Sequence, residues 1–132
     1  LAPEQMNPLI KKVEDSGNQN ILLTDRGTSF GYNNLVVDFR GIPIMQTFGY
    51  PVVFDATHSV QLPGANGVCS GGDRRFVPSL ANAAMAVGAN ALFFEVHPEP
   101  DKALCDGANM IALEDAEKVF KKCKEIFELA RS

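Results

Sequence analysis

Apolar residues along the chain follow two patterns, one with helical spacing and one of short continuous runs. Helical spacing predicts helices near residues 3–15, 39–48, 76–87 and 116–130. Continuous apolar runs predict strands at residues 20–24, 52–54 and 91–94. Pro8 lies inside the first helical stretch and is expected to kink its first turns. The predicted order of elements is therefore α-β-α-β-α-β-α.

Strands that alternate with helices predict an α/β protein with a parallel sheet and right-handed crossover connections. Each strand–helix unit has the size of one repeat of a (β/α)8 TIM barrel, which needs about 250 residues in total. We therefore expect residues 1–132 to form about half of one barrel domain. The chain begins with Leu1 rather than Met, and helical spacing starts almost at once, so we expect a piece of a longer protein. Half a barrel would leave an open sheet edge.

Composition limits the classes of partner that this chain is expected to bind. The formal net charge of −4 argues against a nucleic-acid or anionic-membrane surface, because both select for basic patches. No apolar run approaches the roughly 20 residues that span a bilayer. The three cysteines, Cys69, Cys105 and Cys123, contain no Cys-x-x-Cys pair, which favours a reducing cytoplasm over a disulfide framework.

Charged residues follow each of the three predicted strands directly. The first strand runs into Asp25, Arg26 and Gly27, the second into Asp55, Ala56, Thr57 and His58, and the third into Glu95, Val96 and His97. In α/β proteins the chemistry lies at the carboxyl ends of the strands. The repeated pattern therefore predicts a functional site at this end of the sheet.

Arg26 offers a planar guanidinium at the end of the first strand, and this group matches phosphate or carboxylate. The alternative is a surface arginine paired with Asp25 or with an acid of a neighbouring strand. Its position favours the anion-binding interpretation.

His58, Glu95 and Asp106 form a candidate constellation. His58 and Glu95 end neighbouring strands, and Asp106 lies in the loop after the third strand. One imidazole and two carboxylates suit a divalent metal such as Mn, Fe or Zn, or act as acid and base without metal. Hydrogen-bonded strand-end side chains without a chemical role are the alternative. His97 competes with His58, and the pattern favours a supporting or capping role for it.

A glycine-rich stretch at residues 64–72 precedes Asp73, Arg74 and Arg75. It could be a mobile lid whose arginines meet an anionic ligand, or simply a flexible connection. It is not a P-loop, because the Gly-Lys-Ser/Thr step is missing. None of the three cysteines is predicted to be a nucleophile, since Cys123 fits an apolar helical stripe and the others lie far in sequence from an obvious base.

Three long blocks resemble the 3-deoxy-D-manno-octulosonate 8-phosphate synthase family. The blocks are TDRGTSFGYNNLVVD at residues 24–38, FDATHSVQLPG at residues 54–64 and EVHPEPDKALCDG at residues 95–107. The resemblance covers nearly the whole chain and implies the C-terminal half of a single (β/α)8 catalytic domain. The N-terminal half, with its lysines and sugar-phosphate site, would lie outside this chain.

The resemblance implies a transferase that condenses phosphoenolpyruvate with arabinose 5-phosphate, on the route to the lipopolysaccharide inner core. Arg26 would grip the phosphate of phosphoenolpyruvate, with Asp55, Asn33 and Arg75 as further substrate-binding residues. His58, Glu95 and Asp106 would be the catalytic residues. A cytoplasmic homotetramer is expected by resemblance only. The alternatives are a related phosphoenolpyruvate-condensing enzyme, of the DAHP synthase or sialic acid synthase type, and a non-catalytic barrel fragment that serves as a scaffold.

Cofactor use depends on the branch of that family. The branches differ at an early-strand position, Cys or Asn, which would lie outside this chain. In a metal-dependent member His58, Glu95 and Asp106 would hold the ion. Residues 102–107 look more like the metal-independent branch, so catalysis without a cofactor is the expectation.

Overall fold

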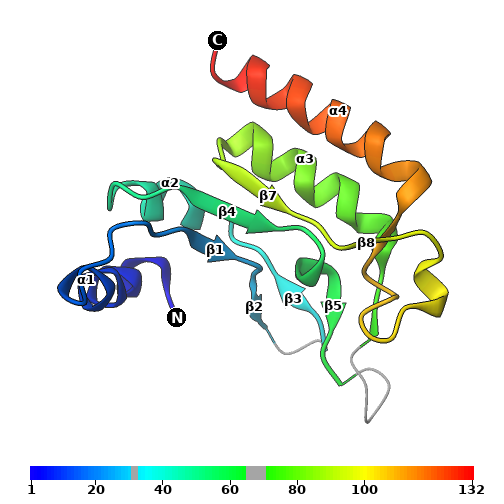
Figure 1. Ribbon diagram of the computed structural model, residues 1–132, viewed down its shortest axis with the longest axis horizontal. Coiled ribbons are helices and arrows are strands. Elements are labelled where there is room, and N and C mark those ends of the chain that lie inside the picture. Colours follow the sequence, from blue (N-terminus) through cyan, green and yellow to red (C-terminus); the bar gives the residue numbers. More distant parts are fainter. Residues whose placement is uncertain (31–32, 65–70) are drawn as a thin grey trace.

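A three-stranded parallel sheet forms the centre of the molecule. The structure is a computed structural model that describes residues 1–30, 33–64 and 71–132. Its sheet has the order β1 (Leu23–Asp25), β4 (Val52–Asp55), β7 (Ala91–Phe93), with Thr24 opposite Val53 and Val53 opposite Ala91 (Figure 1). All four residues of β4 are buried, as expected for the middle strand of a covered parallel sheet. The α/β prediction and the parallel sheet are confirmed.

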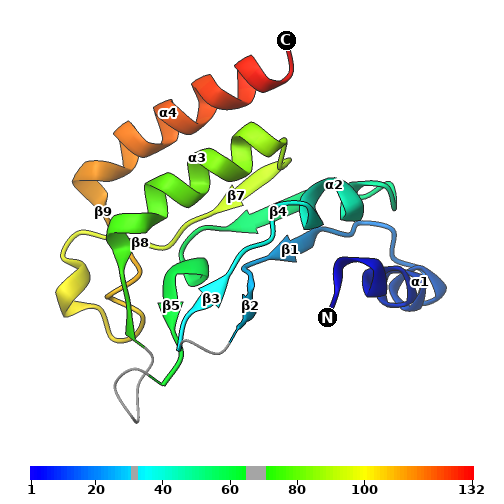
Figure 2. The ribbon, with the colours of Figure 1, turned by 180° about the vertical axis from the view of Figure 1, so that it is seen from behind.

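Four α-helices accompany this sheet: α1 (Asn7–Asp15), α2 (Gly41–Gln46), α3 (Val77–Val87) and α4 (Leu113–Ala130). Figures 1 and 2 show α3 beside α4 along the β7 side, and α1 beyond β1 at the opposite end. The hydrophobic core joins β4 to these helices through Phe54, Ile42 and Val77, each fully buried. The predicted order of the principal elements is therefore observed.

The helix boundaries differ from the predicted ones for local reasons. A 3-10 turn (Pro3–Met6) precedes α1. Pro8 lies in the first turn of α1, where backbone N–H groups have no intrahelical partner, so the missing N–H of proline costs no hydrogen bond. The α2 helix keeps only six of the ten predicted residues. The last helix starts at Leu113, earlier than predicted, with Glu114 and Asp115 in its first turn, where acids favour the helix dipole.

Short strand pairs occur where loops were predicted. β2 (Thr28–Ser29) and β3 (Leu35–Val36) form an antiparallel pair, and so do β5 (Gln61–Leu62) and β6 (Gly71–Gly72). β8 (Val96–His97) pairs in parallel with β9 (Ile111–Ala112), directly before α4. Strands of two residues are too short for hydrophobic periodicity to reveal them.

Three further 3-10 turns complete the described elements, at His58–Val60, Arg74–Phe76 and Pro100–Lys102. The first turn begins three residues after the end of β4, and the third lies between β8 and β9. Both turns therefore lie on segments that follow the carboxyl ends of the central strands.

Both edges of the central sheet are open. Among the described residues, β1 and β7 each pair only with β4, so the outer side of each lacks a neighbouring strand. Several large apolar side chains are also exposed, including Leu22 (64%) and Leu113 (58%). Within the described part of the chain, no helix is both long and apolar enough to cross a membrane.

Candidate active site

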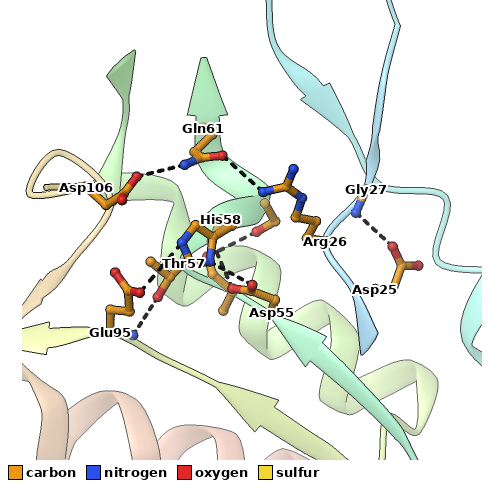
Figure 3. Close-up of polar contacts among 11 residues, drawn as sticks. Asp25, Arg26, Gly27, Asp55, Thr57, His58, Gln61, Glu95 and Asp106 are labelled. Atoms are coloured by element: carbon orange, nitrogen blue, oxygen red, sulfur yellow. Dashed lines mark hydrogen bonds and ion pairs between the residues drawn. The ribbon is translucent and has the colours of Figure 1, made fainter. Parts of the chain in front are cut away.

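His58 is held in one orientation by the strand that precedes it. β4 ends at Asp55, and one oxygen of this carboxylate accepts the backbone N–H of His58 at 2.9 Å while the other lies 2.7 Å from His58 Nδ1 (Figure 3). The Asp55 and His58 side chains are only 11% and 19% exposed. An ionised carboxylate can only accept, so Nδ1 donates the ring proton to Asp55, and Nε2 faces the opposite side, toward Glu95. Asp55, predicted to bind substrate, lies with both oxygens on His58.

Glu95 lies opposite His58 at the end of the neighbouring strand. Its backbone N–H donates to the Thr57 hydroxyl at 2.7 Å, and its Oε1 lies 3.6 Å from His58 Nε2. Thr57 is fully buried, so this bond fixes the backbone of Glu95 against the end of β4. The second carboxylate oxygen, Oε2, is buried without a hydrogen-bond partner among the described residues. A buried acceptor of this kind fits a cation or a proton donor.

Asp106 completes the cluster from the loop between β8 and β9. Its backbone adopts a φ of +52°, which is uncommon for a residue other than glycine. Its carboxylate accepts a hydrogen bond from the Gln61 side chain at 2.8 Å. Ligand atoms of His58, Glu95 and Asp106 all lie within 4.8 Å of one another. The three residues singled out from the sequence therefore come together at one place.

The donor set of this cluster fits a divalent metal. An imidazole nitrogen and two carboxylate oxygens are common ligands of Mn, Fe and Zn, and the partnerless oxygen of Glu95 matches a cation. Asp55 would serve as the outer carboxylate that orients a metal-bound histidine. The same three groups can accept and return protons without a metal.

Arg26 lies near this cluster at the end of β1. Its guanidinium donates to Gln61 Oε1 at 3.4 Å and forms no ion pair with any described residue (Figure 3). Asp25 forms no ion pair with it, and Oδ1 of that carboxylate accepts the backbone N–H of Gly27 at 2.8 Å. The exposed Arg26 guanidinium therefore keeps donors available for an anionic ligand.

Gly27 shapes the turn that presents Arg26. Its φ of +85° favours glycine, and a Cβ there would come within 2.8 Å of the Val36 carbonyl oxygen. The glycine thus allows β3 to approach the end of β1 closely, which sets the direction of the chain directly after Arg26.

Other predicted binding residues lie outside the contacts of the cluster. Asn33 is exposed with a φ of +53°, between β2 and β3. Arg75 is exposed and grips Asp73 through bonds of 2.8 and 2.6 Å, and these bonds lower the pKa of Asp73. His97 Nδ1 accepts the backbone N–H of Glu99 at 2.9 Å, a capping contact of the kind that the pattern favoured.

The described cysteines have little thiolate character. The hydrogen bond with Asp106 raises the pKa of Cys105, and burial raises the pKa of Cys123. A thiol with a raised pKa is a poor nucleophile at neutral pH, as predicted. Cys69 and most of the glycine-rich stretch, residues 65–70, lie outside the described residues, so the predicted lid stays a prediction.

Sequence reasoning missed the contacts of Thr57 and Gln61. Both residues stand inside the block at 54–64, but their partners are far away in the chain: Glu95 for Thr57, and Arg26 and Asp106 for Gln61. A polar residue in a motif carries no sign of such a partner, so no pattern in a single sequence would have found these bonds.

Comparisons with known proteins identify the family. The model of the DAHP synthetase I family matches residues 1–132. A protein of Desulfosudis oleivorans is 63% identical over 118 residues, which cover 89% of this chain and 42% of the relative. Proteins of Protochlamydia amoebophila (57% identical) and Nitratidesulfovibrio vulgaris strain DP4 (58% identical) each match over 129 residues, or 98% of this chain and 47% of the relative.

All three relatives bear the name 2-dehydro-3-deoxyphosphooctonate aldolase, which confirms the resemblance to the octulosonate phosphate synthases. The chain spans about half the length of the curated relatives it matches. The family model matches this chain from its first residue to its last, and the chain belongs to the DAHP synthetase I family.

Proposed function

We propose that the protein carrying this chain condenses phosphoenolpyruvate with arabinose 5-phosphate, giving 3-deoxy-D-manno-octulosonate 8-phosphate and inorganic phosphate. One observation carries the proposal: His58, Glu95 and Asp106 converge at the carboxyl ends of parallel strands, near an arginine free of ion pairs with described residues. The names of the relatives support the choice of reaction. This chain would form the C-terminal half of a (β/α)8 barrel, and the remaining substrate contacts would come from the other half.

The chemistry joins carbon 3 of the enol to the aldehyde carbon while water attacks carbon 2, and the hemiketal phosphate that forms then expels phosphate. Arg26 binds the phosphate of phosphoenolpyruvate through charge-assisted hydrogen bonds. The attacking water donates one hydrogen bond to Glu95 Oε2, the buried oxygen that lacks a partner among the described residues. Glu95 takes the proton of this water, and the same proton equivalent is returned to the aldehyde oxygen as it becomes a hydroxyl.

His58 and Asp106 hold the reacting water and the sugar. Asp55 holds the His58 ring with Nε2 directed toward Glu95, and a neutral imidazole in this orientation would accept a hydrogen bond from the second hydrogen of the water. Asp106 accepts a hydrogen bond from a hydroxyl of the sugar, and Gln61 contacts only one of its two carboxylate oxygens. These groups fix the water on one side of carbon 2, which favours attack over exchange with solvent.

Metal use is a separate part of the proposal. His58 Nε2, Glu95 and Asp106 would hold a divalent ion, and a fourth ligand would come from outside this chain. Such an ion supplies positive charge that stabilises oxygen anions. The likeness of residues 102–107 to the metal-independent branch supports turnover without it.

A panel of acceptor sugars tests the proposal. The complete protein is incubated with phosphoenolpyruvate and, in parallel, arabinose 5-phosphate, erythrose 4-phosphate or N-acetylmannosamine, and phosphate release and product mass are measured. Turnover is expected with arabinose 5-phosphate. Preference for erythrose 4-phosphate or N-acetylmannosamine would replace the proposal by the DAHP synthase or sialic acid synthase type. A folded protein without turnover on any of the three would support the scaffold alternative.

A further inference from the structure

Gln61 connects two parts of the site that the backbone does not connect. It starts β5, three residues after His58, and its side chain is half-buried. Its Nε2 donates to Asp106 Oδ1 at 2.8 Å, and its Oε1 accepts from Arg26 at 3.4 Å (Figure 3). One amide thus contacts the end of β1 and the loop between β8 and β9.

The two partners fix the orientation of this amide. A guanidinium has donors only and an ionised carboxylate has acceptors only, so the carbonyl must face Arg26 and the NH₂ must face Asp106. The Arg26 guanidinium has no ion pair among the described residues, and a hydrogen bond with Cys105 is the other side-chain contact of Asp106 there. Gln61 is therefore the side chain that joins the two charged groups, with the shorter of its two bonds made to Asp106.

The Gln61 amide is neutral, and this neutrality matters for both of its charged partners. A direct Arg26–Asp106 ion pair would use up the donors that an anion needs and the carboxylate that the cluster needs. A glutamine between them contacts both charges and neutralises neither.

We propose that Gln61 is a positioning residue that aligns Arg26 with Asp106 while keeping both charges available to substrate. The inference rests on the proposed function for its kinetic consequence, but not for its structural one. Its place in the reaction is indirect, because it acts through the two residues that it holds.

Gln61→Glu tests this role most directly, because a carboxylate has the shape of the amide but carries a negative charge and has no N–H to donate to Asp106. The new carboxylate would bind the Arg26 guanidinium and repel Asp106. The KM for phosphoenolpyruvate should rise about tenfold, and the KM for arabinose 5-phosphate should rise as well, because Asp106 is the residue proposed to bind a hydroxyl of the sugar. Gln61→Leu, which removes both contacts without adding charge, should lower kcat more than it raises either KM.

Gln46 provides the matched control. Its Nε2 donates to the Gly88 carbonyl and to Asn90 Oδ1, both at 2.8 Å, before the amino-terminal end of β7, whereas Glu95 follows the carboxyl end of that strand. Gln46→Glu removes two side-chain hydrogen bonds that lie outside the cluster, so it reports the consequence of the same substitution for stability alone. It should lower the midpoint of unfolding and leave both KM values unchanged.

Hydrogen–deuterium exchange of the complete protein tests the restraint without any substrate. Both Gln61 variants should speed exchange in residues 103–110, where Asn109 N donates to the Asp106 carbonyl at 2.8 Å, and Gln46→Glu should not. Unchanged exchange in this segment, or an unchanged KM for phosphoenolpyruvate in an active Gln61→Glu enzyme, would overturn the inference. A wild-type protein without turnover would refute the proposed function instead, and the exchange measurement would still decide the role of Gln61.

Discussion

Thr57→Val removes one buried acceptor from the centre of the site with almost no change in shape. The Thr57 hydroxyl accepts the backbone N–H of Glu95 at 2.7 Å, and Thr57 is fully buried. Valine leaves that N–H without a partner in a half-buried setting, which destabilises a protein by about 1–3 kcal/mol. The unpaired N–H must also move to find another acceptor, and this movement carries Glu95 away from His58.

Thr57→Ser is the matched control. Serine keeps the oxygen and loses one buried methyl group, worth about 1 kcal/mol. The two variants should therefore lose similar stability in urea denaturation of the complete protein, but only valine should displace Glu95. We expect kcat for phosphate release to fall about tenfold for Thr57→Val and less than about threefold for Thr57→Ser.

The comparison of Thr57→Val with Thr57→Ser separates an effect on the position of Glu95 from an effect on the stability of the protein. If Thr57→Val keeps the wild-type kcat, or if Thr57→Ser loses as much activity as Thr57→Val, then the hydroxyl does not set the position of Glu95. The role given to that hydrogen bond would then be wrong.

Three further outcomes follow from the open sheet edge and the charged cluster. Arg26→Ala should raise the KM for phosphoenolpyruvate by about 10- to 100-fold in steady-state kinetics, because charge-assisted bonds to phosphate are lost, and a defect confined to the sugar phosphate would contradict its role. The 132-residue chain alone should elute as aggregates in size-exclusion chromatography, because the β1 edge is open and apolar side chains such as Phe93 (44% exposed) face the solvent. A monomer that unfolds cooperatively would contradict this expectation. Dialysis of the complete enzyme against a chelator should leave activity intact, whereas loss and recovery with Mn²⁺ or Zn²⁺ would make His58, Glu95 and Asp106 true ligands.

The general position of the site could be predicted because parallel strands end at one edge of a sheet. β4 and β7 are neighbours, as expected, so residues directly after them meet whatever the details of the loops. That argument brought His58 and Glu95 together from sequence alone. The sequence evidence for including Asp106 was weaker, because tertiary contacts such as the hydrogen bond from Gln61 determine where its loop lies.

Side-chain directions could not be predicted in the same way. Asp55 was expected to bind substrate, yet its oxygens face His58, because a carboxylate three residues before a turn can accept both the backbone and the ring N–H. Arg75 was predicted to bind substrate; its guanidinium bonds Asp73, two residues away, and the substrate-binding role stays a prediction. Local hydrogen bonds of this kind decide where a polar side chain points, and periodicity does not record them.

Coupling between His58 and Glu95 tests the central claim most directly, namely that these side chains act together on one water. The measurement is kcat for phosphate release by the wild type, His58→Gln, Glu95→Gln and the double variant of the complete protein. Residues that act as a unit give strongly non-additive losses, so the double variant should fall within about threefold of the slower single variant. Losses that multiply in the double variant would mean that His58 and Glu95 act independently, and the account of a shared site would be contradicted.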